Sequence, residues 1–140
     1  MRHNVAFRKF ARTQGHRRAL LRNMATALII YGHYETTVQK AKDLRGVVER
    51  LITKARVDTV ASRRRASAYL MTNEAVKKLF VEIAPGYKSR PGGYTRVLRT
   101  RRRAGDAAEM ACIELIAAEE SNKGTKKKAN RKQAAEEKSA

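Results

Sequence analysis

The sequence predicts an α+β protein, with about four helices packed against a small sheet and a basic extended arm before them. Between residues 38 and 56, apolar residues recur every three or four positions with charged residues opposite, which indicates a helix with one buried face. Two alternating runs, 94–103 and 108–117, flank the turn Ala104-Gly105-Asp106 and predict a β-hairpin. At 140 residues, the chain is long enough to bury the core of one domain.

A first helix is expected from about residue 16 to 31. Thr13 to Gly15 form its entry, and Gly32 ends it, because glycine readily adopts the left-handed conformation just past a helix. Residues 33–37 are rich in strand-favouring types and predict a short strand that joins the sheet. The apolar face of this first helix, which we expect to be buried, contains Leu20, Leu21, Met24, Leu28 and Tyr31.

Two further helices are expected before the hairpin. The third helix, about 59–71, takes Asp58 as its N-cap, and the fourth, about 74–84, takes Asn73 and is ended by Pro85-Gly86. The domains are therefore a basic extended arm over 1–15, a globular domain over 16–117 and a charged tail over 118–140. The tail has no apolar residue larger than Ala, so we expect it to lack fixed structure in solution, with a helix formed on binding as the alternative.

The formal net charge of +19 points to a polyanionic partner. Nucleic acid is the first candidate, since phosphates are densely charged and release counterions when cations bind them. The cations concentrate in two segments without acidic residues, 1–22 and 88–103. Both favour Arg, whose planar fork binds phosphate bidentately and stacks on bases. A basic protein without a specific partner is the alternative.

The predicted RNA-binding residues come from these two segments. Three adjacent arginines at the hairpin tip would repel one another without a counter-charge, which favours contact with nucleic acid. For Tyr94, stacking on a base and packing in the core are equally compatible with the sequence. The set is Arg2, His3, Arg8, Lys9, Arg12, His16, Arg17, Arg18, Arg22, Asn23, Lys88, Arg90, Tyr94, Arg96, Arg99, Arg101, Arg102 and Arg103.

Other functional classes find little support. The histidines have no carboxylate or cysteine partners at ligand spacing, and no nucleophile or phosphate-loop signature is present, so we expect no enzyme, no cofactor and no metal site. Cys112, the single cysteine, reads as a small core residue. We expect no membrane span and no signal peptide, and a cytosolic chain. Extended arms and arginine-rich loops suit folded RNA, and a nucleoid-type DNA-binding protein is the alternative.

Six blocks in order resemble the bacterial ribosomal large-subunit protein L17 family and cover about residues 1–116. The blocks are Met1-Arg2-His3; His16-Arg17 to Arg22-Asn23-Met24; Thr36-Thr37 with Lys40-Ala41-Lys42-Asp43-Leu44-Arg45; Asn73-Glu74 with Lys78-Leu79-Phe80; Gly92-Gly93-Tyr94-Thr95-Arg96; and Arg103-Ala104-Gly105-Asp106 with Met110-Ala111 and Ile113-Glu114-Leu115. The arm departs from the family at residues 4–7, where the family tends to be more basic. The tail after about Ile116 extends beyond the usual end.

The resemblance implies a compact α/β protein that binds large-subunit ribosomal RNA and supports assembly without catalysis. It also implies a position near the polypeptide exit side of the cytoplasmic ribosome. Neighbouring large-subunit proteins, such as those of the L32 family, are the protein partners that it implies.

Overall fold

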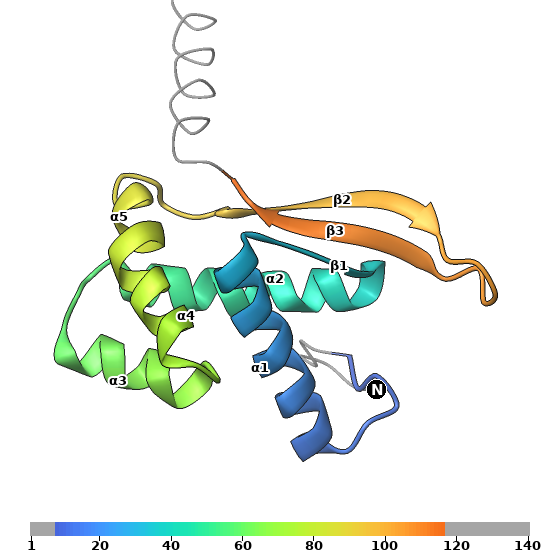
Figure 1. The fold of residues 1–140 in the computed structure, drawn as a ribbon, viewed down its shortest axis with the longest axis horizontal. Coiled ribbons are helices and arrows are strands. Elements are labelled where there is room, and N and C mark those ends of the chain that lie inside the picture. Colours follow the sequence, from blue (N-terminus) through green and yellow to red (C-terminus); the bar gives the residue numbers. More distant parts are fainter. Residues whose placement is uncertain (1–7, 117–140) are drawn as a thin grey trace, which may run out of the picture.

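The computed structural model describes residues 8–116, so the predictions for residues 1–7 and for the tail 118–140 lie outside the described residues. The chain folds into helices on one side and an antiparallel sheet on the other, which confirms the α+β prediction (Figure 1). The elements are α1 (Gln14–Tyr31), β1 (His33–Thr37), α2 (Val38–Ala55), α3 (Val60–Tyr69), α4 (Asn73–Lys78), the π-helical turn η1 (Leu79–Ile83), α5 (Ala84–Gly86), β2 (Thr95–Arg102) and β3 (Glu109–Leu115).

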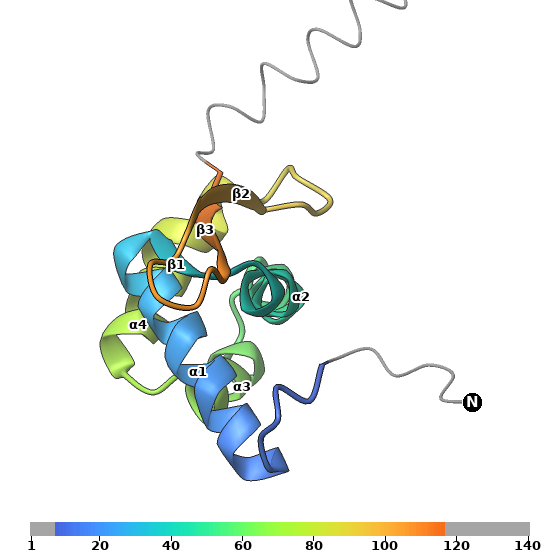
Figure 2. The same cartoon turned by 90° about the vertical axis from the view of Figure 1, so that its right-hand side faces the viewer.

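The sheet has the order β1-β3-β2, so the predicted strand at 33–37 does pair with the hairpin. In the shared register Cys112 faces Glu35 on one side and Leu98 on the other. The β2–β3 register shifts between Arg99 and Arg102, near the hairpin tip. Figures 1 and 2 show the sheet lying across one side of α1 and α2, so one face is covered and the hairpin projects beyond the helices.

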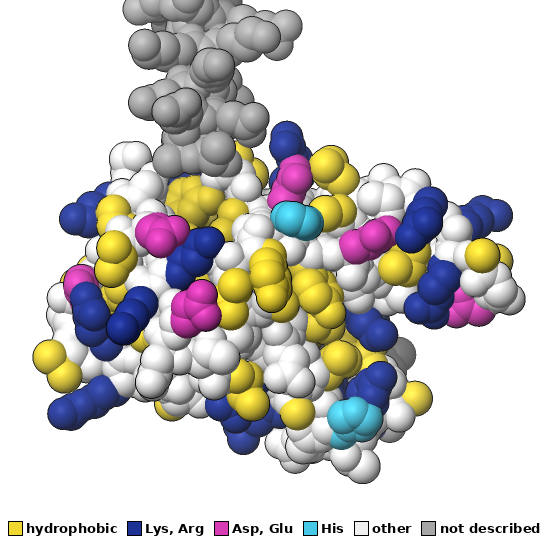
Figure 3. All heavy atoms as spheres, viewed as in Figure 1, with side chains coloured by type: hydrophobic (Ala, Val, Ile, Leu, Met, Phe, Trp, Pro, Cys, Tyr) yellow, Lys and Arg dark blue, Asp and Glu magenta, His cyan; other side chains and the backbone are white. Residues whose placement is uncertain are grey.

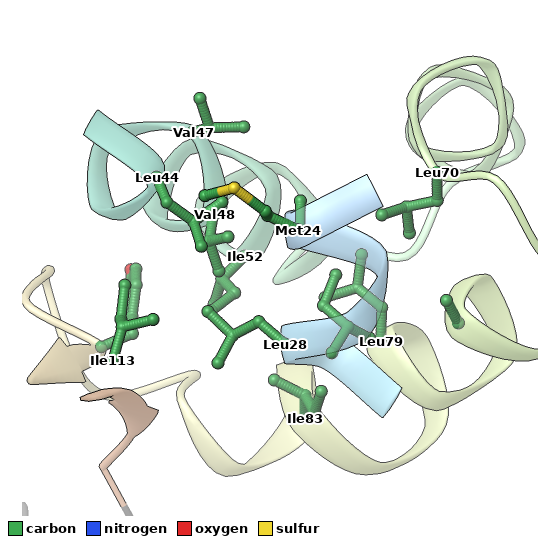
Figure 4. Close-up of a cluster of buried hydrophobic side chains, with 14 of the residues drawn as sticks. Met24, Leu28, Leu44, Val47, Val48, Ile52, Leu70, Leu79, Ile83 and Ile113 are labelled. Carbon is green, nitrogen blue, oxygen red and sulfur yellow. The ribbon is translucent and has the colours of Figure 1, made fainter. Parts of the chain in front are cut away.

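The core lies between α1, α2, η1 and the covered face of the sheet. Leu28, Ile52, Leu79 and Ile113 come from these four elements and are completely buried. Figure 4 shows their side chains in one cluster. The apolar spacing in the sequence therefore predicted the faces of α1 and α2 that form this cluster.

Tyr31 is an exception, because its side chain is 70% exposed rather than buried as the spacing predicted. The buried stripe of α1 is centred on Leu21, Ala25 and Leu28. Successive residues turn by about 100° around a helix, so Tyr31 falls at the margin of that stripe. It is also the last residue of α1.

Both predicted N-caps are wrong by one residue. The cap of α3 is Thr59, whose hydroxyl accepts the backbone N–H of Ser62, and the Ser62 hydroxyl completes a capping box. Asp58 instead accepts two hydrogen bonds from the guanidinium of Arg63. The cap of α4 is Thr72 in place of Asn73. Threonine and aspartate or asparagine are all good caps, so neighbouring pairs of them leave the choice to tertiary contacts.

The helix does end at the predicted Pro85-Gly86, but it includes both residues and so runs two positions beyond the expected end at about 84. A proline in a helix lacks its N–H and its ring clashes with the preceding turn. Here the turn before it is π-helical, and the backbone N–H of Ala84 bonds to the carbonyl of Leu79, five residues earlier. The wider turn lets the helix pass through the proline before it ends.

Candidate nucleic-acid interface

The described part of the arm is tied to α2 by a buried carboxylate. Asp43 is only 6% exposed, and its two oxygens accept the backbone N–H of Arg8 at 3.0 Å and the Arg8 Nη1 at 2.7 Å. Arg8 was predicted to contact RNA, and half of its side chain does face solvent. Sequence reasoning missed Asp43, because its partner lies 35 residues away.

The other described residues predicted in the first basic segment lie around the start of α1. Arg12 contacts His16 one helical turn later, with 2.8 Å between the Arg12 Nη1 and the His16 Nε2. His16 and Arg18 are exposed, and Arg17 is partly buried. Lys9, Arg12, His16, Arg17 and Arg18 thus lie at the N-terminal end of α1, whereas Asn23 is exposed near the middle of that helix. Arg2 and His3 lie outside the described residues.

Arg22 has a structural role that the sequence did not reveal. Its Nε donates to the carbonyl of Tyr69 at 2.6 Å, and its Nη2 donates to the carbonyl of Ala68 at 3.1 Å. These carbonyls belong to the last turn of α3, which has no later turn to supply donors. Arg22 therefore holds the C-terminal end of α3 against α1, and its guanidinium also lies 6.0 Å from the centre of the Tyr69 ring.

The hairpin arginines have counter-charges within the fold, contrary to the expectation from the sequence. Arg101 lies 3.6 Å from Glu35 of β1, Arg96 lies 2.6 Å from Glu114 of β3, and Arg99 lies 4.0 Å from Glu109. Figure 3 shows Lys and Arg along the hairpin with Asp and Glu between them. The arginine side chains in these pairs are at least half exposed, so each pair adds at most about 1 kcal/mol. Such weak pairs leave the arginines able to bind phosphate.

Asp106 closes the hairpin tip. Its carboxylate accepts hydrogen bonds from the Arg103 guanidinium and from the backbone N–H of Ala108. These bonds lower the pKa of Asp106 to about 2, and the bond from Arg103 has the largest effect. Arg103 is therefore partly used in shaping the turn, while Arg102 beside it is exposed.

In the loop before β2, Tyr94 is a core residue. Its side chain is 0% exposed, and its hydroxyl accepts a hydrogen bond from Arg56 at 3.0 Å. The alternative of base stacking is thus excluded for Tyr94 in this structure. Arg56 also donates to the carbonyl of Arg90 at 2.9 Å, so it fixes the basic loop on the end of α2. Lys88 is exposed on that loop.

A groove between α2 and β2 adds cations that were not predicted. It has a volume of about 540 Å³ and no acidic residue in its lining. Lys42 and Arg45 of α2 face Arg96 and Arg99 of β2 across it. Only the packing of α2 against β2 places these residues together, so their pattern along the sequence gave no signal. The lining consists of Val38, Lys42, Arg45, Thr95, Arg96, Val97, Arg99 and Ile116.

The ion pairs leave a large surplus of positive charge. Within residues 8–116, every acidic residue except Glu74 already takes part in an ion pair. In the whole sequence Lys and Arg outnumber Asp and Glu by 32 to 13. Most of the surface cations within residues 8–116 therefore have no acidic side chain of that range left to neutralise them.

Two kinds of site are not found in the described part of the chain. Residues 8–116 contain no group of three or more His, Cys, Asp or Glu side chains placed to hold a metal ion. Among the same residues, no helix is both long and apolar enough to cross a membrane. Fold and surface define a small, strongly basic α+β protein.

The comparisons with known proteins identify its family. The family model described as Ribosomal protein L17 matches residues 20–116. The chain is 54% identical over 116 residues to the large ribosomal subunit protein bL17 of Helicobacter hepaticus, which covers 83% of this chain and 100% of that protein. It is 56% identical over 116 residues to the bL17 protein of Gemmatimonas aurantiaca, which covers 83% of this chain and 98% of that protein.

A third relative, the bL17 protein of Campylobacter jejuni subsp. jejuni serotype O:23/36, is 54% identical over 117 residues, covering 84% of this chain and all of that protein. The chain belongs to the ribosomal protein L17 family. The resemblance seen in the six sequence blocks is thereby confirmed. The relatives are named as ribosomal proteins and not as enzymes, which agrees with the expectation of no catalytic function.

Proposed function

We propose that this chain is a structural constituent of the large ribosomal subunit that binds large-subunit ribosomal RNA and supports assembly and translation in the cytoplasm. Membership of the ribosomal protein L17 family supports the assignment to the large ribosomal subunit. The observation that carries RNA binding is the unpaired surplus of positive charge, since nearly all described acids are already in ion pairs. A dense polyanion is the partner that neutralises such a surface.

Two surfaces are proposed to contact the RNA. The first is the arm with the start of α1, and the second is the basic loop and hairpin from Lys88 to Arg103. The hydrogen bonds between Asp43 and Arg8 support the first surface, because they fix where the arm leaves the globular domain. The groove lined by Lys42 and Arg45 lies beside the second and extends it. The body then holds two separated basic surfaces in a fixed relation.

Protein neighbours are a further part of the proposal. Large-subunit proteins, among them members of the L32 family, are the expected contacts, on the strength of the resemblance. Chemical crosslinking of the assembled subunit tests this expectation.

The test of the proposed function is co-sedimentation of the tagged chain with large subunits through a high-salt wash. We expect the full chain to remain with the large subunit and a chain lacking residues 1–15 to be lost or depleted while its body stays folded. Normal retention of the truncated chain would show that the arm is not the anchor. Recovery of the full chain with chromosomal DNA instead would favour the nucleoid-type alternative.

A further inference from the structure

A third cationic site adjoins the first of the two surfaces described above and lies between α1 and α3. It is a hollow of about 300 Å³ lined by Arg18, Arg22, Arg65, Ala68 and Tyr69, which we call the Tyr69 hollow. Three of its five lining residues are arginines and none is acidic. The volume is at the lower end of the range of about 300–1,000 Å³ typical of small-ligand sites.

The arginines of the Tyr69 hollow differ in their freedom. Arg22 is fixed by its hydrogen bonds to the carbonyls of Ala68 and Tyr69. Arg18 and Arg65 are exposed, and neither makes a hydrogen bond or ion pair with any residue in the range 8–116. Two arginines from different helices, without a partner among residues 8–116, therefore line the same hollow as one that is already oriented, an arrangement that favours a shared anion such as phosphate.

Tyr69 supplies the aromatic part of the site. Its ring is partly buried and stands between the Tyr69 hollow and a second hollow of about 250 Å³, whose lining includes Arg50 and Lys54 of α2. Burial raises the pKa of the Tyr69 hydroxyl, and the charges of Arg50, Arg22 and Arg18 oppose that shift. The hydroxyl stays protonated at neutral pH and can donate a hydrogen bond. RNA that is not base-paired is commonly bound by stacking on aromatic rings and guanidinium planes.

We propose that the Tyr69 hollow binds a single unpaired nucleotide of RNA, with its phosphate held by Arg18 and Arg65 and its base against Arg22 and the Tyr69 ring. This inference rests on the proposed function and adds a specific structural feature of the RNA. Arginines along a flat face would fit the backbone of a duplex. A concave, nucleotide-sized hollow with an aromatic wall fits one unstacked residue better.

The test measures binding of the full chain to a transcript of large-subunit ribosomal RNA. Arg65→Gln removes one cation from the hollow, and Arg64→Gln is its matched control, because Arg64 is exposed on the same helix and lines neither hollow. We expect Arg65→Gln to raise the Kd about tenfold and to lower the salt-dependence slope by about one, as for one lost phosphate contact. Arg64→Gln should change the Kd less than about twofold.

A second readout identifies the bound nucleotide. Acylation of RNA 2′-hydroxyls should show unpaired positions that are protected by the wild type and by Arg64→Gln but reactive with Arg65→Gln. Tyr69→Leu should weaken binding about fivefold or more through lost stacking, whereas Tyr69→Phe keeps the ring and should largely retain it. Thermal unfolding of each variant confirms that it is folded.

Three results would contradict either the nucleotide site or the proposed function. Equal effects of Arg65→Gln and Arg64→Gln would overturn the site while leaving the proposed function intact. Loss of protection only within paired helices would show a duplex backbone contact and would also overturn it. If the wild type binds duplex DNA as tightly as the ribosomal transcript, the proposed function itself fails.

Discussion

Replacing Asp43 with Asn should cost about 2 kcal/mol of folding free energy. The Asp43 carboxylate accepts two hydrogen bonds from Arg8, at 3.0 Å from the backbone nitrogen and at 2.7 Å from the guanidinium. A hydrogen bond to a charged group contributes about 1.5–3 kcal/mol. Asparagine keeps one acceptor oxygen and turns an amide NH₂ toward the other donor, so one of the two bonds is lost. The half-exposed Arg8 can then turn to water, which places the cost near the lower part of that range.

Urea unfolding of the RNA-free chain measures this cost through a double-mutant cycle. Asp43→Asn, Arg8→Gln and the double variant should give a coupling free energy of about 1–2 kcal/mol. Lys9→Gln is the charge-matched control and should couple to Asp43→Asn by less than about 0.3 kcal/mol, as independent sites do. In thermal unfolding, 2 kcal/mol corresponds to a loss of about 8 °C. Additive effects of Asp43→Asn and Arg8→Gln would refute the docking of the arm on α2.

Three further predictions address the fold and the hairpin. In urea unfolding, Leu28→Ala should destabilise the chain by about 2–5 kcal/mol because Leu28 is fully buried. Tyr31→Ala should change the free energy of unfolding by less than about 0.5 kcal/mol. Similar costs for the two variants would contradict the assigned buried and exposed faces of α1. Gly32→Ala should cost about 1 kcal/mol, because Gly32 ends α1 at φ 78° with open space around it; an unchanged melting temperature would argue against this conformation. The pKa of Asp106 is lowered to about 2, so the stability from its pairing is present above a pH of about 4 and is lost as the pH falls toward 2. In an NMR titration, the Arg103→Gln variant should show a higher midpoint for the Asp106 carboxyl than the wild type. A wild-type midpoint already near the ordinary value would exclude the pairing.

The parts of the fold that depend on local spacing were predictable from the sequence. The apolar stripe at 38–56 predicted α2, Gly32 marked the end of α1, and the two alternating runs predicted the hairpin. The N-caps failed because Thr59 and Asp58 are both good caps, and the choice depends on Arg63 occupying the aspartate. Pro85-Gly86 marked the end of the last helix, but its π-helical turn was not foreseen, because apolar spacing does not reveal a change in the hydrogen-bonding register.

The candidate interface was less predictable, because its interactions join segments far apart in the sequence. Glu35 and Arg101 are neighbours only through the arrangement of strands in the sheet, so the segment 88–103 seemed to lack counter-charges when read along the chain. Arg22 was indistinguishable from its neighbours until α3 was placed beside it. Arg65 likewise stands in a run of three arginines, of which Arg63 pairs with an acid and only Arg65 lines the Tyr69 hollow.

The central claim is that surplus cations bind large-subunit ribosomal RNA, and the salt dependence of that binding tests it most directly. Each neutralised phosphate contributes about 0.7–0.9 to the slope of log K against log salt concentration. With six or more contacts from the arm, the hairpin and the adjoining grooves, affinity should fall by orders of magnitude between about 50 and 200 mM salt. An affinity that stays constant across this range would contradict the electrostatic account of the protein.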